Sequence, residues 1–389
     1  MKKILYILSS SSPFGGSTKS IEAVMQNIEK SPIYKFGVVL PNKTGVYNDW
    51  VKRGWKVYVI ANRHANYPPC KTIKSVLLFP IAFLYHKYIN YNAYRLIKKI
   101  VIQEKYDIIH SNVGVLDIGY KAAISLSIPH IYHLREYQDL DFGEKIYPSK
   151  KTFIQRLKNK NNYTITITKN LYNYFNCNSS SVVIYNGVVT ENLKSIDWNK
   201  EPYFLFAGRL SKAKGIESVL YAFEKLHKRF PQFRLKVAGA PIDSSYMDEL
   251  KSMTSKLNIS EHVHFLGATD KVSELMRKAM GMIMASTNEG LGRVTIEAMS
   301  EGCLVIGYNA HGTKEQFDNG YSLTGKEIGI RYLSSSELIE AMTEIASNGI
   351  FKYREMIESA QKTVSYLYSI NKCTDSIINF YNHIFNEES

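Results

Sequence analysis

The chain has 389 residues, of which 45% are hydrophobic and 22% are charged. This composition is ordinary for a globular protein and excludes intrinsic disorder, while the length is too great for one ordinary domain and suits two. The net charge of +14 is uneven, because residues 1–195 carry 27 Lys and Arg against 11 Asp and Glu, whereas the remainder carries 22 against 24. Such a basic half indicates an anionic partner surface or, alternatively, a solvated basic face without a partner.

No targeting or membrane-spanning segment is predicted. Met1–Ser9 has a short apolar run that leads into a Ser/Gly-rich turn, which favours a buried strand over a signal peptide. The longest apolar run, Val76–Tyr85, contains Pro80 and is too short to cross a bilayer. The four cysteines are scattered without metal-ligand spacing, so we expect a reduced, cytoplasmic compartment.

The first half alternates short apolar segments with helical patterns, which predicts a parallel, doubly wound sheet. The expected strands are Ile4–Leu8, Phe36–Leu40, Lys56–Ile60, Asp107–His110, His130–His133, Tyr163–Thr168 and Val182–Tyr185. Helices are expected between them, for example at Ser17–Glu29 and Leu116–Leu126.

The second half repeats this alternation and predicts a second sheet of the same kind. The expected strands are Tyr203–Phe206, Arg234–Ala238, Val263–Leu266, Gly281–Met284 and Leu304–Gly307. The expected helices are Ile216–Arg229, Met247–Leu257, Lys271–Lys278, Val294–Gly302 and Ser335–Ser347.

The polar stretch Val189–Pro202 is the expected linker. We therefore predict an N-terminal domain over 1–190, a C-terminal domain over 191–370, and a helix over 371–389 that can cross back to the first domain. Because ligands bind at the carboxyl ends of parallel strands, two such domains predict a site in a cleft between them.

The segment Asn288–Gly302 (NEGLGRVTIEAMSEG) carries the strongest signal for chemistry. It follows an expected strand and opens an expected helix, whose first backbone N–H groups attract phosphate while the glycines allow close approach. Glu289, before the turn, is placed to meet sugar hydroxyls, and Glu297, in the first turns of the helix, to meet ribose hydroxyls.

A second segment, Phe204–Gly215 (FLFAGRLSKAKG), places two cations between a strand and a helix. Arg209 and Lys214 suit a diphosphate whose negative charge grows as a glycosidic bond breaks. The alternative is ordinary surface basic residues.

With these two segments, the chain resembles the retaining GT4 glycosyltransferases (glycosyl transferases group 1) of GT-B fold. Glu289 and Glu297 match the EX7E signature of that family, and the resemblance covers most of the chain but is tight only in the second half. It implies two Rossmann-like domains that face each other across a cleft, and an enzyme that uses Arg209 and Lys214 in place of a metal.

The resemblance also implies residue roles in donor binding. The first Glu, here Glu289, contacts the donor sugar, the second, Glu297, holds the ribose, and backbone amides of Leu291, Gly292, Arg293 and Val294 bind the sugar and diphosphate. The sequence departs from the family at Leu291 and Arg293, where Phe and an aliphatic residue are common.

Further candidates lie in the first half. Gly15 and Gly16 open the first strand-to-helix turn, where the family has a Gly-rich turn over the diphosphate; a plain tight turn is the alternative. His133 ends an expected strand and corresponds to a family His that contacts the donor sugar near the reaction centre. The candidates for the acceptor side are His110, Arg135 and Glu136.

Metal and nucleic acid are not expected. Asp139-Leu140-Asp141 spells DxD, which holds a metal in GT-A enzymes, but it lies in the wrong architecture and is interpreted as a loop or acceptor feature. Arg-rich stacking motifs for RNA are not visible. No cofactor is expected beyond the nucleotide-diphosphate sugar that serves as donor substrate.

Residues 71–99 mix basic and apolar side chains and have two interpretations. The segment is typical of an interfacial segment on an anionic leaflet, or of a buried helix or helix pair in the first domain.

The sequence thus predicts a metal-independent hexosyltransferase that uses a lipid-linked or cell-envelope glycan acceptor and lies peripherally at the inner face of the cell membrane. The alternatives are a GT-B sugar-nucleotide epimerase, a phosphorylase, or a non-catalytic sugar-binding protein.

Overall fold

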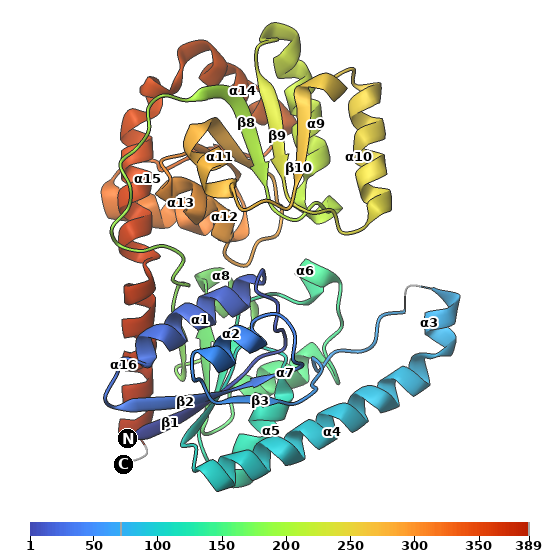
Figure 1. Cartoon of the computed structure of the whole chain (residues 1–389), viewed down its shortest axis with the longest axis vertical. Coiled ribbons are helices and arrows are strands. Elements are labelled where there is room, and N and C mark those ends of the chain that lie inside the picture. Colours follow the sequence, from blue (N-terminus) through green and yellow to red (C-terminus); the bar gives the residue numbers. More distant parts are fainter. Residues whose placement is uncertain (71, 388–389) are drawn as a thin grey trace. The chain divides into compact units, whose positions relative to one another are not determined.

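The computed structural model describes residues 1–70 and 72–387 and divides into two compact units (Figure 1). Unit 1 contains Met1–Gly187 together with the C-terminal segment that begins at Cys373, and unit 2 contains Val188–Lys372. Unit 1 is therefore built from two separate stretches of chain, whereas unit 2 is continuous.

Unit 1 is a seven-stranded parallel sheet with the order β3-β2-β1-β4-β5-β6-β7. Most residues of its central strands are buried because helices cover both faces of the sheet. The strands are β1 (Lys2–Ile7), β2 (Tyr34–Leu40), β3 (Val57–Val59), β4 (Ile108–Ser111), β5 (His130–Leu134), β6 (Asn162–Thr166) and β7 (Ser181–Val183).

The helices of unit 1 include the last helix of the chain. They are α1 (Gly16–Ile28), α2 (Tyr47–Lys52), α3 (Ile73–Leu77), α4 (Phe79–Glu104), α5 (Asp117–Leu126), α6 (Asp139–Phe142), α7 (Lys150–Leu157), α8 (Lys169–Tyr174) and α16 (Ile370–Glu387). Ile377, Tyr381 and Ile384 recur along one face of α16, which places them in the same buried cluster as β1 and β2. Figure 1 accordingly shows α16, in red, beside these blue strands.

Unit 2 is a six-stranded parallel sheet with the order β10-β9-β8-β11-β12-β13. Its strands are β8 (Glu201–Ala207), β9 (Arg234–Ala238), β10 (Val263–Gly267), β11 (Ala279–Met284), β12 (Val305–Tyr308) and β13 (Ile330–Tyr332). Its helices are α9 (Ile216–Arg229), α10 (Ser244–Lys256), α11 (Val272–Lys278), α12 (Arg293–Ser300), α13 (His311–Thr324), α14 (Ser335–Asn348) and α15 (Arg354–Leu367).

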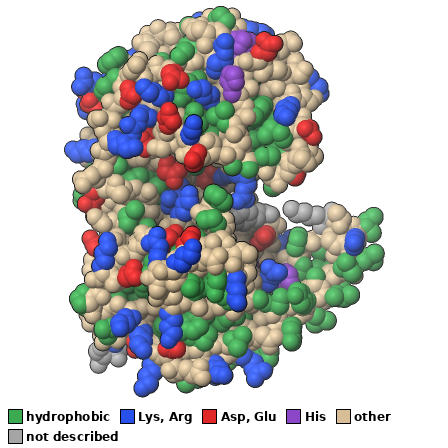
Figure 2. Space-filling model, in the orientation of Figure 1, with side chains coloured by type: hydrophobic (Ala, Val, Ile, Leu, Met, Phe, Trp, Pro, Cys, Tyr) green, Lys and Arg blue, Asp and Glu red, His purple; other side chains and the backbone are tan. Residues whose placement is uncertain are grey.

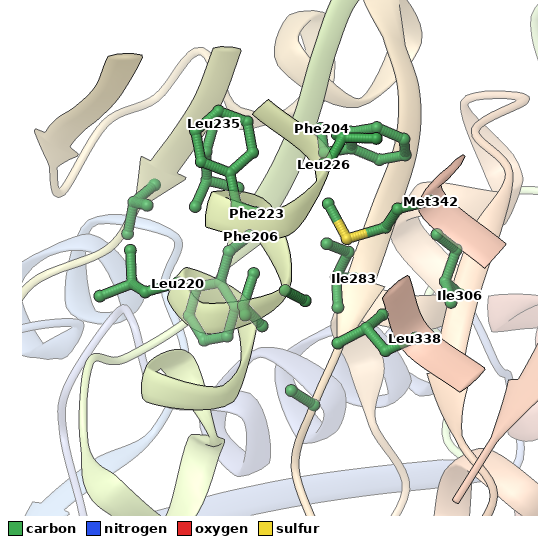
Figure 3. Packing of buried hydrophobic residues seen from close by; sticks show 14 of the residues in the cluster. Phe204, Phe206, Leu220, Phe223, Leu226, Leu235, Ile283, Ile306, Leu338 and Met342 are labelled. Atoms are coloured by element: carbon green, nitrogen blue, oxygen red, sulfur yellow. The ribbon is translucent and has the colours of Figure 1, made fainter. Parts of the chain in front are cut away.

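The core of unit 2 lies between its sheet and helices α9 and α14. Leu220, Phe223 and Leu226 on one face of α9 are fully buried in the cluster that also holds Phe206 and Leu235. Leu338 and Met342 of α14 join Ile283 and Ile306 in the same cluster (Figure 3). Each large side chain buried in this way contributes about 1.5–3 kcal/mol relative to exposure, so the sheet offers a rigid base for the loops at its edge.

The structure differs from the sequence-based expectations at a few elements. The expected linker ends early, because Glu201 and Pro202 already belong to β8. The edge strand β13 and helices α13 and α15 were not predicted; β13 has an arginine at its centre and so no continuous apolar run, and α13 has a mixed polar pattern.

Both sheets reverse their strand order next to their first strand. The reversal lies between β1 and β4 in unit 1 and between β8 and β11 in unit 2. Ligands of open α/β sheets bind outside the carboxyl ends of the strands at such a switch point. The loops after these four strands are therefore where a site is expected.

Candidate active site

In unit 2, the loops after β8 and β11 bring Lys214 and Glu289 together. The Nζ atom of Lys214 donates a hydrogen bond to Oε1 of Glu289, and both side chains are only partly exposed. Gly215 makes this approach possible, because it has a φ of +69° and a Cβ there would lie 2.4 Å from the carbonyl oxygen of Ala285. The two residues predicted for the sugar and diphosphate thus share one site.

The turn before α12 has the geometry of an anion-binding helix N-terminus. Gly292 caps the helix with a φ of +78°, and no side chain caps the first turn. The Thr295 N–H bonds to the Gly292 carbonyl oxygen at 3.1 Å, and the first turn carries the positive end of the helix dipole. Leu291, where the family often has Phe, is buried and anchors the turn in the core.

Helix α13 supports this turn, a role that the sequence analysis missed. Gln316 donates from Nε2 to the carbonyl oxygens of Leu291 and Gly292, the latter at 3.2 Å. The Gly312 N–H donates to the Glu289 carbonyl oxygen at 3.0 Å. Because the carbonyls are held toward α13, the turn is fixed before any ligand binds.

Buried polar atoms without hydrogen-bond partners in the structure gather at the same turn. They include the hydroxyl oxygens of Thr295 and Thr313 and the Oε1 atom of Gln316. A Cβ at Gly292 would lie 3.5 Å from the Thr295 hydroxyl and 3.8 Å from that of Thr313. An unpaired buried polar group costs about 1–3 kcal/mol, so the turn has unsatisfied capacity for polar interactions.

The remaining predicted residues of unit 2 follow the neighbouring strands β8 and β11 in the chain. Arg209 is exposed and follows Gly208 directly at the end of β8. Arg293 and Glu297 form an ion pair at 3.4 Å along the first turns of α12. The Glu297 side chain is 38% exposed, which leaves it accessible to a ligand.

In unit 1, the predicted glycines begin α1 at the switch point. Gly15 is the N-cap and Gly16 the first helical residue. The first turn of α1 is tied to the end of β4, because Asn112 Nδ2 donates to the Ser17 carbonyl oxygen at 3.2 Å. Asn112 Oδ1 in turn accepts from Nε of Arg135, which follows β5, at 3.0 Å.

His133 and His110 lie side by side in a buried chain of hydrogen bonds. His110 Nε2 is 3.0 Å from His133 Nδ1, and His110 Nδ1 is 2.6 Å from the hydroxyl of Tyr381 on α16. The Nη2 atom of Arg135 lies 3.3 Å from His133 Nδ1, whereas His133 Nε2 is buried without a hydrogen-bond partner among the described residues. His133 is thus buried rather than open at the strand end, with one ring nitrogen uncommitted.

Burial, with the nearby Arg135 charge as a second cause, lowers the pKa of both His110 and His133 well below the usual range. Both rings are therefore neutral at neutral pH. Both nitrogens of His110 contact protein groups, so we expect His110 to act through His133 rather than by touching an acceptor.

The other acceptor-side candidates are also partly committed to the protein. Arg135 is buried and donates to Asn186 in addition to Asn112. Glu136 accepts from Gln138 Nε2 at 3.1 Å, and burial raises the pKa of its carboxyl group.

The DxD carboxylates contact protein groups rather than forming a cluster of metal ligands. Asp141 accepts the Tyr137 N–H at 2.7 Å, and Asp139 pairs with Lys150 at 3.4 Å. Among the described residues, no group of three or more His, Cys, Asp or Glu is placed to hold a metal ion.

For the described part of residues 71–99, the structure decides between the interfacial and the buried-helix interpretations. All 26 residues of α4 are described, and only Ala93, Ile97 and Val101 are buried. Most apolar side chains on α3 and the first half of α4 are exposed, so the buried-helix interpretation is wrong for this part. Residues 1–70 and 72–387 contain no helix that is long and apolar enough to span a bilayer.

Two family models match consecutive parts of the chain. The model for Glycosyltransferase Family 4 matches residues 46–192, and the model for Glycosyl transferases group 1 matches residues 188–363, which contain all the predicted site residues of unit 2. The chain is a group 1 glycosyltransferase. It is therefore an enzyme that transfers a sugar to an acceptor, as the sequence predicted.

Individual glycosyltransferases agree with this assignment. The chain is 27% identical to an uncharacterized glycosyltransferase of Methanocaldococcus jannaschii, over 75% of this chain and 80% of that protein. It is also 27% identical to alpha-monoglucosyldiacylglycerol synthase of Streptococcus pneumoniae, over 65% of this chain and 62% of the synthase.

The fold is shared with solved glycosyltransferase structures. Anabaena HepE, crystallised in complex with UDP, superposes with a TM-score of 0.78 over 98% of this chain and 100% of HepE, at 20% identity. This similarity confirms the predicted GT-B fold.

Proposed function

We propose that this group 1 glycosyltransferase moves a hexosyl group from a nucleotide-diphosphate sugar to its acceptor, with retention of configuration and without a metal ion. The observation that carries the proposal is the convergence of Lys214 and Glu289 at the switch point of unit 2, beside the N-terminus of α12. The HepE structures with UDP and UDP-glucose support a nucleotide-sugar donor.

The roles of the site residues follow from their charges and from the negative charge that develops on the donor diphosphate. Arg209, Lys214 and the first amides of α12 stabilise the diphosphate as the anomeric C–O bond breaks and negative charge moves onto it. Glu289 binds hydroxyls of the transferred sugar and holds the Lys214 ammonium in place before the donor arrives. Glu297 accepts hydrogen bonds from the ribose, and the leaving phosphate helps to deprotonate the acceptor.

The experiment has two stages. A thermal-shift screen of UDP-, GDP- and ADP-sugars identifies the donor, because a ligand that binds the folded state raises its stability. Product formation is then followed by NMR of the anomeric centre, with and without EDTA. A retained configuration and unchanged turnover in EDTA are expected.

Other outcomes separate the alternatives. Isomerised sugar nucleotide in the absence of acceptor indicates an epimerase. Tight donor binding without release of nucleoside diphosphate indicates a sugar-binding protein. Activity that EDTA abolishes and Mg²⁺ or Mn²⁺ restores contradicts the metal-free role of Arg209 and Lys214.

We further propose that the acceptor is lipid-linked or a cell-envelope glycan and that the enzyme works peripherally at the cytoplasmic face of the membrane. The supporting feature is an apolar surface on α3 and the first half of α4, which we call the α3–α4 surface. Its exposed members are Ile73, Val76, Leu77, Leu78, Ile81, Leu84, Tyr85, Tyr88 and Tyr91. Figure 2 shows green side chains gathered there, at the right of the molecule.

The arrangement on α4 supports contact with a bilayer. Phe79 and Phe83 face inward and stack on Tyr67, whereas Ile81, Leu84 and Tyr88 point away at helical spacing. Exposed Lys74 and Lys87 lie among the apolar residues and are complementary to anionic headgroups. The name of the Streptococcus pneumoniae relative, a monoglucosyldiacylglycerol synthase, supports a lipid acceptor.

Vesicle co-sedimentation tests the surface. Binding is expected to need anionic lipid, to weaken with salt, and to fall in the double variant Ile81→Gln, Leu84→Gln. The matched control is Leu333→Gln, which replaces an exposed leucine of unit 2. Equal binding of the double variant and the control, or no binding at low salt, overturns the membrane proposal; concentration-dependent dimerisation that the double variant abolishes assigns the surface to a second copy instead.

A further inference from the structure

A directed chain of hydrogen bonds in unit 1 sets the tautomer of His133. It joins the hydroxyls of Tyr6 and Tyr381 at 2.9 Å, Tyr381 to His110 at 2.6 Å, and His110 to His133 at 3.0 Å. All four side chains are buried. Tyr381 comes from α16, so it reaches β4 from a helix 271 residues further along the chain.

The Arg135 side chain determines which atoms donate and which accept in this chain of hydrogen bonds. A guanidinium only donates hydrogen bonds, so His133 Nδ1, 3.3 Å from Nη2 of Arg135, must be an acceptor. A neutral imidazole has one donor and one acceptor nitrogen, which places the proton of His133 on Nε2.

The donors and acceptors of the other hydrogen bonds, toward α16, are assigned in the same way. Because His133 Nδ1 accepts, His110 must donate from Nε2, and its Nδ1 must accept from the hydroxyl of Tyr381. The Tyr381 oxygen then accepts from Tyr6. Burial raises the pKa of the hydroxyl groups of both tyrosines, so each keeps the proton that it donates.

The chain of hydrogen bonds ends at a ring nitrogen of His133. The Nε2 atom of His133 is buried and has no hydrogen-bond partner among the described residues. We propose that Tyr381, acting through His110 and together with Arg135, is a positioning residue that holds His133 as the Nε2–H tautomer, so that His133 donates a hydrogen bond to a substrate oxygen and does not act as a base. This inference deepens the proposed function, on which its catalytic consequence rests.

The tautomer itself is measured without substrate. Long-range ¹H–¹⁵N NMR of ¹⁵N-histidine-labelled enzyme distinguishes protonated from unprotonated ring nitrogens, and the His133 signals are assigned by their loss in His133→Gln. We expect Nε2 protonated and Nδ1 unprotonated in both His133 and His110, with the His110 Nδ1 shift altered in Tyr381→Phe. A proton on His133 Nδ1 overturns the proposal whatever the enzyme transfers.

The functional role is measured by a double-mutant cycle. Tyr381→Phe keeps the ring and removes the hydroxyl, and we expect kcat to fall about five- to tenfold, with little change in the donor KM. The same substitution in a His133→Gln background is expected to have no further effect, because the group through which Tyr381 acts is gone. An equal loss of kcat in both backgrounds indicates a merely structural role and overturns the proposal.

Tyr34→Phe is the matched control. Tyr34 donates to Asn382, the residue after Tyr381 on α16, and takes no part in the chain that reaches His133. It removes a tyrosine hydroxyl that contacts the same helix, so kcat is expected to stay at the wild-type level. If Tyr34→Phe lowers kcat as much as Tyr381→Phe does, the effect belongs to packing of α16 and the positioning role fails.

Discussion

The ammonium group of Lys214 and the carboxylate of Glu289 form an ion pair across 75 positions of sequence, from loops that follow β8 and β11. These two strands are neighbours in the sheet, and their order reverses at this point. A cation and an anion held together here before a ligand binds explain how one site can meet both a diphosphate and the hydroxyls of a sugar.

Lys214→Ala is expected to lower kcat about 100-fold, because it removes a positive charge aimed at the leaving diphosphate. Steady-state kinetics with the donor found in the thermal-shift screen measure the effect. Lys212→Ala is the control, since Lys212 lies two residues earlier and pairs with Glu249 at 3.6 Å. If both variants lose activity equally, the loss does not come from the Lys214 site.

Glu297→Ala is expected to weaken donor binding about tenfold, or about 1.4 kcal/mol, because a carboxylate that accepts from the ribose is lost. Isothermal titration with the intact donor measures it. Glu301→Ala alters the residue after α12 instead, where the carboxylate pairs with Arg277 at 2.7 Å, and it should leave donor affinity unchanged. An unchanged dissociation constant for Glu297→Ala removes the ribose role.

Gly312→Ala, in α13, is expected to distort the turn before α12 that packs against it. A Cβ at Gly312 would lie 2.8 Å from the Glu289 carbonyl oxygen and 2.9 Å from the Leu291 carbonyl, so backbone must shift. We expect a loss of about 1–3 kcal/mol in unfolding free energy together with weaker donor binding. Gly281→Ala, whose nearest contacts would be 3.4 Å or longer, is the control; donor binding that survives Gly312→Ala shows that the turn adapts.

Acid is expected to destabilise unit 1 through its buried histidines. Burial lowers the pKa of His130 to about 3 and those of His110 and His133 well below 6.5. The unfolded chain therefore binds more protons below pH 6.5, and stability falls as the pH falls. His130 contributes a loss of about 2 kcal/mol at pH 5, His110 and His133 act in the same direction, and the raised pKa of Glu136 offsets part of the total.

Urea unfolding between pH 8 and pH 5 measures this proton uptake. His130→Gln is expected to reduce the slope of stability against pH by about one proton, whereas His264→Asn, at an exposed position, should leave it unchanged. A free energy of unfolding that does not change between pH 6.5 and pH 5 contradicts the prediction that the buried histidines are neutral.

Most of the fold was predictable because its signals are local. Buried parallel strands are continuous apolar runs, and each of the twelve expected strands overlaps an observed one. Helix α9 has the predicted bounds, since its apolar spacing and the preceding Gly215 mark its face and its start. The edge strand β13 was missed, because Arg331 interrupts its apolar residues.

The site was predictable only in part. The motif around Glu289 and the loop that holds Lys214 stand out in the sequence, because helix N-termini and paired cations have local signatures. Gln316, Gly312 and Tyr381 do not, because each acts on residues that only the tertiary fold brings near. A glutamine within a polar helix or a tyrosine on an amphipathic one has no local feature that marks its partner.

Helix α16 also constrains the order in which the chain can fold during its synthesis. Unit 2 is continuous, so its whole sheet is available for folding once Lys372 has left the ribosome. Unit 1 is synthesised first but still lacks Ile377, Tyr381 and Ile384 of its core at that moment. Until α16 is synthesised, unit 1 therefore lacks part of its core and exposes the apolar residues of β1 and β2 that α16 covers.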